Sequence, residues 1–436
     1  MRIELHNIGP IRDACVELGP LTVLIGPNGS GKTILSSVTH AAATAARQAS
    51  LRARVYGRRW ETSGRDRPQA SDIVARWEEA FRETLQSELQ RCCAEDLTTL
   101  GREYRAGRNA APRITIGQGA FSSEDTWNVI FRLDADHLVV ERSNKRYRPP
   151  HLDQAEMEHA SPSTLDRYLL RAFAGPPTRS YYFPASRSGL MQTFSTLTAL
   201  VFGALGAGYF EDVTLGKIPG LASDFLQFLA QIDPTRTTRI GGHAIDLLER
   251  ELLHGHISLD VSGPARKVSF APDGFTQTYP IESAATSTAE IAPLLLYLRH
   301  VATPADALFI DEPEAHFHPR NQVSLARALT VVADEVRNVV LATHSEFLLA
   351  ELSNIVMERA GEHSDHRSST PLHIYEFVPS DPRGGVSIRR HEFEPLEGFD
   401  IEQFSTVAEE TYDRSVDIYN RVHGHESTHE RRLARD

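Results

Sequence analysis

The feature that most constrains the fold is a glycine-rich segment at residues 26–33, which fits the pattern GxxxxGK[ST] without a mismatch. The apolar, β-branched run Leu21–Ile25 before it is typical of a buried strand. The alanine-rich stretch from Lys32 to about Ala46 after it predicts a helix. Glycines let backbone N–H groups turn inward around an anion, and the helix N-terminus adds about half a positive charge. The order of these elements predicts a loop that holds phosphate groups.

The same segment indicates the ligand. In loops of this pattern the lysine reaches the β- and γ-phosphates and the last hydroxyl binds Mg²⁺. Lys32 and Thr33 stand at these positions, and Lys32 is one of only four lysines among 46 basic residues. We therefore expect ATP and Mg²⁺ as ligands. The residues around the nucleotide would be Gly26, Pro27, Asn28, Gly29, Ser30, Gly31, Lys32 and Thr33.

A second strand end carries the acids that such a loop needs. The apolar run Ala307–Ile310 is followed by Asp311 and Glu312. Open α/β sheets place their ligands at the carboxyl ends of strands. We expect Asp311, with Thr33, to bind the metal, and Glu312, which points the other way, to polarise the attacking water. An acidic pair after an apolar strand is otherwise a common surface turn, but the phosphate loop favours the catalytic interpretation.

A third apolar run, Val339–Ala342, ends in Thr343-His344-Ser345. His344 can contact the γ-phosphate through a ring nitrogen, or it can be a buried side chain with its hydrogen bonds satisfied. We favour the first. The expected catalytic residues are therefore Lys32, Glu312 and His344.

The spacing of apolar residues predicts an α/β fold with a mixed sheet flanked by helices. The segment Ser71–Leu97 places Ile73, Trp77, Phe81, Leu85 and Leu89 on one helical face. Residues 111–143 switch to strand spacing, and the alternation of strand and helix after residue 286 implies a parallel sheet. The expected division is 1–48, an N-terminal lobe; 49–165, an inserted helical and strand region; 166–285, a strand, helices and further strands; 286–425, a C-terminal lobe; and 426–436, a disordered tail.

Charge is unevenly spread along the chain. The net charge is −12, yet residues 50–150 carry clustered arginines and are slightly basic. This region could bind nucleic acid, but an ordinary solvent-exposed helical face is the simpler interpretation and the one we favour. The longest apolar stretch, Ile291–Leu298, is too short to cross a bilayer, and three cysteines give no disulfide framework. Since the N-terminus reads directly into a strand pattern, we expect a cytoplasmic protein with no membrane partner.

These motifs together resemble those of ABC-type ATPases of the soluble SMC- and OLD-like branch. Residues 26–33 resemble its Walker A motif, Leu308–Pro319 its Walker B motif with the following E-x-x-x-H-P, and Ala342–Ser345 its H-loop. The segment Tyr181–Arg187 resembles the strand that leads into the Q-loop region. The resemblance covers nearly the whole chain, with residues 48–170 matching only in outline. It implies an ABC-type ATPase head with an inserted region between its two halves.

One motif of that family departs from its usual form. The signature before Walker B normally contains glycine, but here it reads Ser283-Ala-Ala-Thr-Ser287-Thr-Ala-Glu290. Thr286, Ser287 and Thr288 could still cap the following helix and offer hydroxyls to a phosphate. By resemblance, Ser287 would contact the nucleotide of a second chain in a head-to-tail homodimer or higher oligomer. We expect slow turnover, or completion of the site by a partner.

The sequence offers no second catalytic centre. It lacks the Asp-x-Asp that a Toprim nuclease would need after His344. The pairs His254/His256 and His316/His318 could suggest metal, but neither has a cysteine or second cluster nearby. Three functions remain: a sensor or switch subunit with a separate effector, as in bacterial antiphage defence; a DNA repair or maintenance ATPase of the SMC kind, whose long heptad arms are missing; and a transporter motor, which the large insertion disfavours. The first leads.

Overall fold

A computed structural model of the chain describes residues 1–61, 70–93, 97–101, 111–118, 127–134, 137–143, 179–207, 218–263, 266–362, 372–380, 385–391 and 402–422. Residues 144–162, whose content of proline, histidine and charge predicts an internal linker, and the expected tail at 426–436 lie outside these residues. So do Arg65, Arg67, Arg102, Arg105 and Arg108 of the arginine clusters.

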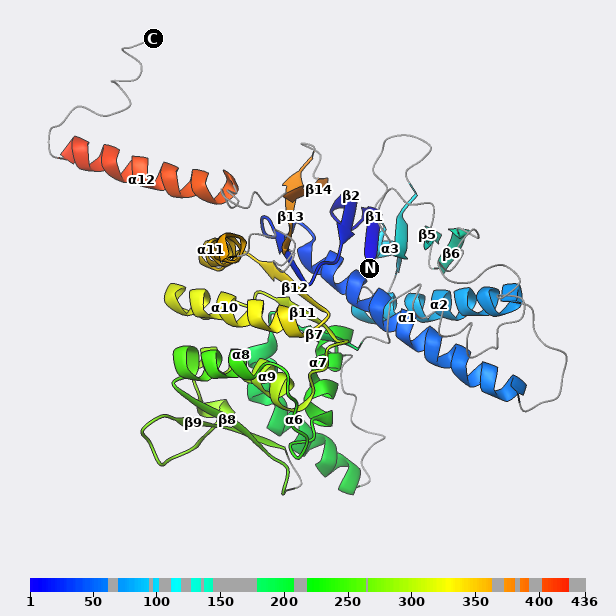
Figure 1. Cartoon of the computed structure of the whole chain (residues 1–436), viewed down its shortest axis with the longest axis horizontal. Helices are drawn as coiled ribbons and strands as arrows, with labels where there is room; N and C mark the ends of the chain where they lie inside the picture. The colour runs from blue at the N-terminus through cyan, green and yellow to red at the C-terminus, as the bar shows by residue number, and fades with distance from the viewer. Residues whose placement is uncertain are drawn as a thin grey trace, which may run out of the picture.

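Eleven of the described strands form one sheet in the order β6-β5-β4-β1-β2-β14-β13-β3-β12-β11-β7. Their bounds are β1 Arg2–Ile8, β2 Ile11–Glu17, β3 Leu21–Ile25, β4 Arg113–Gln118, β5 Trp127–Asp134, β6 His137–Ser143, β7 Ser180–Phe183, β11 Ala307–Asp311, β12 Asn338–Thr343, β13 Leu372–Pro379 and β14 Val386–His391. From β13 through β3, β12 and β11 to β7, neighbouring strands are parallel, which confirms the expected parallel sheet. The sheet with its flanking helices also confirms the mixed α/β class (Figure 1).

Two hydrophobic cores lie on the two faces of this sheet. Because side chains alternate along a strand, Val23 and Ile25 of β3 enter one core and Leu24 enters the other. The first core receives helices α6 Arg187–Ala207, α7 Gly220–Gln231, α8 Gly242–Leu247, α9 Thr286–His300, α10 Pro319–Glu335 and α11 Glu346–Glu362. The second receives α1 Lys32–Glu61, α2 Ala70–Cys92 and the short α3 Leu97–Leu100.

The helix after the phosphate loop is longer than expected. We predicted an end near Ala46, but α1 continues to Glu61 because α2 packs along it (Figure 1). The indole of Trp77 donates to the Ser50 hydroxyl at 3.3 Å, and the Gln48 amide donates to Glu88 at 3.0 Å. Trp77, Phe81, Leu85 and Leu89 are fully buried, as their spacing predicted.

The strands of the expected inserted region continue the main sheet. β4 pairs antiparallel with β1, β5 with β4, and β6 with β5. Residues 113–143 therefore share a sheet with the strands next to the phosphate loop. The domain boundaries given above remain a prediction.

A smaller unit covers one end of the first core. Strands β8 Gly255–Asp260, β9 Lys267–Pro272 and β10 Tyr279–Pro280 form a separate antiparallel sheet. A π-helical turn, Leu248–Leu253, and a 3₁₀ turn, Ile281–Ser283, connect this sheet to the neighbouring helices. Helix α12, Glu402–Val422, extends away from the rest (Figure 1). Within the described residues, no helix combines the length and apolar character needed to span a bilayer.

Candidate active site

The phosphate loop joins the buried strand β3 to the N-terminus of α1, as its sequence predicted. Two of its glycines are required by their surroundings. Gly26 has φ +145°, and a Cβ there would lie 2.8 Å from the Cβ of Phe377. Gly31 has φ +101°, and its Cβ would lie 2.9 Å from side-chain carbons of Pro10 and Ile11. Only glycine fits these positions, so the loop keeps its backbone close to β13 and to the β1–β2 turn.

Lys32 lies inside this loop. Its ammonium group donates to the carbonyl oxygens of Gly26 at 2.8 Å and Pro27 at 2.9 Å. Burial lowers the pKa of Lys32 to about 8, although the nearby carboxylates of Glu312, Asp311 and Glu314 act in the opposite direction. The Ser30 hydroxyl of the same loop is buried without a hydrogen-bond partner. A buried ammonium beside an unpartnered hydroxyl suits a loop that receives an anion.

Asp311 ends β11 and is buried, with 4% of its surface exposed. The Tyr182 hydroxyl of the neighbouring strand β7 donates to its Oδ2 at 2.7 Å, whereas Oδ1 is buried and has no hydrogen-bond partner. Burial raises the pKa of Asp311 to about 6, and the interactions with Tyr182, Arg187 and Thr33 oppose this rise. A carboxylate oxygen without a partner next to the Thr33 hydroxyl is the kind of oxygen ligand that Mg²⁺ takes, so the residues present fit that ion.

Glu312 faces away from Asp311. Its side chain is exposed, and its backbone has φ +46°, a left-handed conformation that is uncommon outside glycine. Two contacts hold this conformation: the Glu312 N–H donates to the carbonyl of Ala342 at 2.7 Å, and the Arg187 guanidinium donates to the Glu312 carbonyl at 3.0 Å. The structure thus presents a carboxylate at the strand end with its backbone fixed from both sides.

Glu314 connects the acidic turn after β11 to the loop after β12 that carries His344. Its Oε1 accepts hydrogen bonds from the Thr343 hydroxyl at 2.7 Å and from the His344 N–H at 2.8 Å. Burial and the nearby Lys32 lower the pKa of His344 against the opposing effect of Glu312 and Glu314, which favours the neutral ring. Glu314 therefore sets the position of His344 relative to Glu312. In the sequence, Glu314 is recognisable only as the glutamate of the E-x-x-x-H-P motif.

Arg187 is the residue of this site that the sequence analysis missed. It is 3% exposed and donates to three consecutive carbonyls, those of Asp311 at 2.6 Å, Glu312 at 3.0 Å and Pro313 at 3.3 Å. Its guanidinium also lies 2.7 Å from the buried carboxylate of Glu290 in α9. The signal in the sequence was an arginine four residues after the strand Ser180–Phe183, since a charge inside a core needs a partner.

The glycine-free signature takes a different form from the one expected. Ala285 is the N-cap of α9 and no side chain caps the helix, so the expected capping by Thr286, Ser287 and Thr288 is wrong. Thr286 and Thr288 both lie within the first helical turn instead of before it. Thr286 is exposed, whereas Thr288 is buried. Among the described residues, no hydrogen bond joins Ser287 to the phosphate loop. Its role toward a nucleotide remains a prediction.

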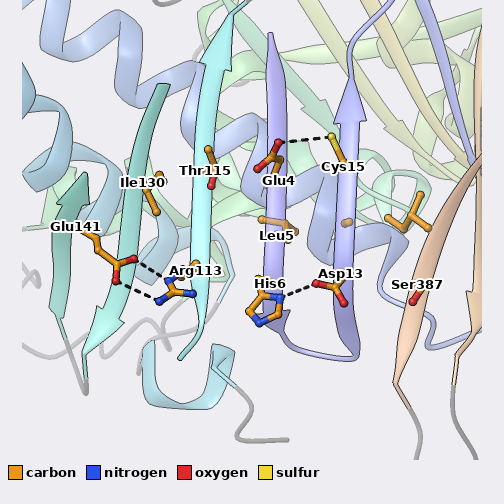
Figure 2. Close-up of a pocket in the computed structure, with 12 residues that line it drawn as sticks. Glu4, Leu5, His6, Asp13, Cys15, Arg113, Thr115, Ile130, Glu141 and Ser387 are labelled. Carbon is orange, nitrogen blue, oxygen red and sulfur yellow. Dashed lines mark hydrogen bonds and ion pairs between the residues drawn. The ribbon is translucent and has the colours of Figure 1, made fainter. Parts of the chain in front are cut away.

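The described part of the arginine-rich region is largely neutralised. Figure 2 shows one sheet face on which Arg113 pairs with Glu141 at 2.7 Å and His6 pairs with Asp13 at 2.6 Å. A shallow hollow of about 740 Å³ on this face is also lined by Glu4. Three carboxylates beside one arginine do not suit a polyanion. The remaining candidates for a nucleic-acid contact in residues 50–150 are exposed arginines away from this face, such as Arg52, and arginines whose side chains lie outside the described set.

Neither histidine pair forms a metal cluster with other described ligands. His256 contacts Glu249 at 3.0 Å, and His318 accepts from the N–H of Arg320 at the start of α10. One group of described side chains, His40, Cys92 and Asp224, does bring three possible metal ligands together. Arg91 already binds both oxygens of Asp224 there, at 2.7 and 2.8 Å, so the protein supplies the cation itself.

Comparison with solved structures returns heads of SMC proteins. An SMC head bound to the C-terminal winged-helix domain of ScpA is 13% identical, covers 90% of this chain and 97% of its own, and has a TM-score of 0.44. An SMC head with an extended coiled coil, bound to the C-terminal domain of ScpA from Pyrococcus furiosus, is 12% identical with 94% and 98% coverage and a TM-score of 0.41. The SMC head domain from Thermotoga maritima is 10% identical with 90% and 98% coverage and a TM-score of 0.39. Likeness of this degree says nothing about the partners of this chain.

No curated protein matches the sequence. A family profile does match, over residues 104–350, which is more than half of the chain. The matched range contains Arg187, Glu290, Asp311, Glu312 and His344, while the phosphate loop precedes it. A P-loop and an acidic strand end of this form belong to ATPases, so the family implies nucleotide hydrolysis. The chain belongs to the family described as "AAA domain, putative AbiEii toxin, Type IV TA system".

Proposed function

We propose that this chain binds ATP with Mg²⁺, hydrolyses it slowly, and acts as a nucleotide-driven switch or sensor subunit with a separate effector. The observation that carries the proposal is the convergence of Lys32, Asp311, Glu312 and His344. Glu312 and Asp311 both act on the pKa of Lys32, and Lys32 and Glu312 both act on that of His344. The strand register supports this convergence: β12 pairs with both β3 and β11, setting Thr343 beside Ile25 and Ala342 beside Asp311, so the phosphate loop, the acidic strand end and His344 lie at the same edge of the sheet.

The roles follow from the geometry of each group. Lys32 and the loop N–H groups would bind the β- and γ-phosphates, and Thr33 with the unpartnered Oδ1 of Asp311 would hold Mg²⁺. The metal, when bound, neutralises charge that develops on the phosphate oxygens. Glu312 would accept the proton of the attacking water. Neutral His344 would donate or accept a hydrogen bond at the γ-phosphate through its ring.

The switch role is supported by the way Arg187 ties the catalytic turn to α9. A change at the γ-phosphate would shift the position of Glu312, whose carbonyl is bound to Arg187. Because Arg187 also pairs with Glu290, the shift would reach α9. The family description names a toxin of a toxin–antitoxin system, which supports a partner for this chain but does not assign the effector role to that partner. By the resemblance of its motifs, we place the chain with stand-alone OLD-like ATPases of antiphage defence, acting as a head-to-tail homodimer.

The direct test is nucleotide binding by Lys32→Ala. Loss of a charge-assisted contact to phosphate should weaken ATP affinity by well over tenfold in calorimetry. Lys267→Ala, which removes an exposed lysine in the separate three-stranded sheet, is the matched control and should bind ATP like the wild type. Unchanged affinity in Lys32→Ala would refute the assignment of the phosphate loop.

A further inference from the structure

We propose that the protein has a second ligand site, which binds a small phosphorylated molecule at the outer edge of the sheet. This edge cavity lies along β7, the last strand of the sheet, where α1, α2 and α7 meet. Its volume is about 570 Å³, within the range of cavities that hold small ligands. The proposal assigns it a phosphate group bound by Arg47 and Arg179.

Among the described residues, Arg47 and Arg179 are the arginines of the cavity without a paired carboxylate, and Arg179 also interacts with the Tyr181 hydroxyl. Arg91, the third arginine of the lining, binds Asp224 at 2.7 and 2.8 Å and also pairs with Glu88. Within the described residues, neither Arg47 nor Arg179 has a carboxylate within ion-pair distance. Arginine in this condition is the usual partner of phosphate, since its planar fork matches the phosphate oxygens.

Neutral polar groups complete the lining. Gln227 and Gln231 lie one turn apart on α7, and Thr44 lies one turn before Gln48 on α1. In the part of the chain that is described, the side chains of Thr44, Gln227 and Gln231 have no hydrogen-bond partner. The rings of Tyr181 and Phe228, in edge contact at 5.7 Å, form the apolar part of the wall. Such a lining suits a phosphate attached to a sugar-sized polar body.

A metal ion or an added strand fits the cavity less well. His40, Cys92 and Asp224 are spaced for a metal, but Arg91 and the His40 ring already bind the Asp224 carboxylate. An added strand would have to lie along the β7 edge. The Arg91 guanidinium, however, reaches from α2 to both Asp224 and the Gly220 carbonyl of α7 in the same cavity that β7 lines. Two arginines without a paired carboxylate among the described residues favour a small anion.

The cavity has a direct connection to the ATP site. Tyr182 lines the cavity, and its hydroxyl donates to Oδ2 of Asp311, the expected metal ligand. His40, eight residues after Lys32 and therefore about 12 Å further along α1, packs edge-on against the Tyr182 ring at 5.4 Å. A ligand that shifts Tyr182 would alter the hydrogen bond to Asp311. This coupling rests on the proposed function, whereas the binding site itself does not.

Binding is tested on the Lys32→Ala protein, so that the phosphate loop contributes little. Ribose 5-phosphate and inorganic phosphate are titrated separately in a calorimeter. We expect saturable binding that falls at least tenfold in Arg47→Gln/Arg179→Gln and persists in Arg52→Gln, an exposed arginine further along α1. Tighter binding of ribose 5-phosphate than of inorganic phosphate would show that the cavity contacts the sugar. Equal affinities would show that it recognises only the phosphate group. No saturable binding of either probe, or equal binding in the double variant, would overturn the site.

Coupling is tested on the otherwise wild-type protein. A saturating amount of the tighter probe should change ATP turnover at least twofold, and the change should vanish in Arg47→Gln/Arg179→Gln and in Tyr182→Phe. Turnover that is unaffected by a bound probe would overturn the coupling. A protein that hydrolyses no ATP at all would refute the proposed function while leaving the calorimetric result for the cavity intact.

Discussion

The guanidinium of Arg187 lies 2.7 Å from the carboxylate of Glu290, and both side chains are almost completely buried. The same guanidinium donates to the carbonyls of Asp311, Glu312 and Pro313. One side chain therefore connects the N-terminal part of α9 to the backbone that carries the expected metal ligand and base. We regard Arg187 as a positioning residue for Glu312.

Arg187→Lys tests this role. Lysine keeps the charge near Glu290 but loses the planar fork that reaches three carbonyls, so Glu312 should lose its fixed backbone. We expect kcat to fall at least tenfold while ATP affinity changes less than threefold. Arg250→Lys, an exposed arginine, should change neither. Arg187→Ala is a poorer test, because it leaves Glu290 buried and unpaired at a cost of about 3–5 kcal/mol. Equal losses of kcat and affinity in Arg187→Lys would indicate a merely structural role.

Glu312→Gln should separate nucleotide binding from chemistry. The amide keeps the size and hydrogen bonding of the side chain but cannot take a proton, so hydrolysis should fall by orders of magnitude while ATP still binds. Any ATP-held dimer should live longer, which size-exclusion chromatography with ATP would show. Glu346→Gln, at an exposed position in the first turn of α11, is the matched control. Wild-type turnover in Glu312→Gln would mean that another group is the base.

The low pKa of Lys32 predicts proton uptake on ATP binding. Burial lowers this pKa from 10.5 to about 8 in the folded protein, so part of the population is neutral at pH 8.5. Between these values the unfolded chain binds more protons, so the stability of the ligand-free protein should rise with pH across that window. Phosphate charge raises the pKa again and draws a proton from solution.

Calorimetry in buffers of different ionisation enthalpy measures this uptake. We expect close to one proton bound per ATP at pH 8.5 or above in the wild type, and less at pH 7. Lys32→Arg supplies the control, because arginine stays protonated throughout and should take up no proton. Identical heats in all buffers at pH 8.5 would contradict the assignment of Lys32 to the phosphates.

The signature segment gives a prediction about rate. Without glycine near the start of α9, the close approach of backbone to a partner's phosphate is hindered, and turnover should fall below the enzyme median of roughly 10 s⁻¹. Ser287→Gly should raise it. Ser283→Gly, in the 3₁₀ turn before α9, should have no effect. An unchanged rate in Ser287→Gly would show that this segment does not face a nucleotide.

The sequence predicted those parts of the site that depend on local order. The phosphate loop could be located because strand, glycines and helix follow one another directly, and Asp311 because it ends an apolar run. Arg187 and Tyr182 could not be assigned in this way. Tyr182 reaches the Asp311 carboxylate across 129 positions, and Arg187 reaches the Asp311 carbonyl across 124. Both contacts exist because β7 lies beside β11, and spacing along the chain does not encode the order of strands in a sheet.

The same limit applies to residues 113–143, whose alternation predicted strands but not their pairing partner. β4 pairs with β1, so this segment is built into the sheet. Its removal would expose the edge of β1, and removal of α2 would strip α1 of the Trp77 and Glu88 contacts. A deletion of residues 50–150 would therefore disturb the ATP site indirectly. Charge substitutions in the arginine clusters are the cleaner probe of that region.

The last prediction is that this chain is not itself the effector. The sequence has no Toprim acid pattern, and a P-loop core converts nucleotide binding into a change of arrangement that another component must read. The purified chain with ATP and Mg²⁺ or Mn²⁺ should leave plasmid DNA and RNA intact. Arg65→Glu/Arg67→Glu, in a cluster outside the described residues, should abolish binding of a partner or nucleic acid while sparing ATP affinity. Arg113→Gln, whose native charge is paired with Glu141, should preserve both. Cleavage that persists in Lys32→Ala and Glu312→Gln would instead place a nuclease site in this chain.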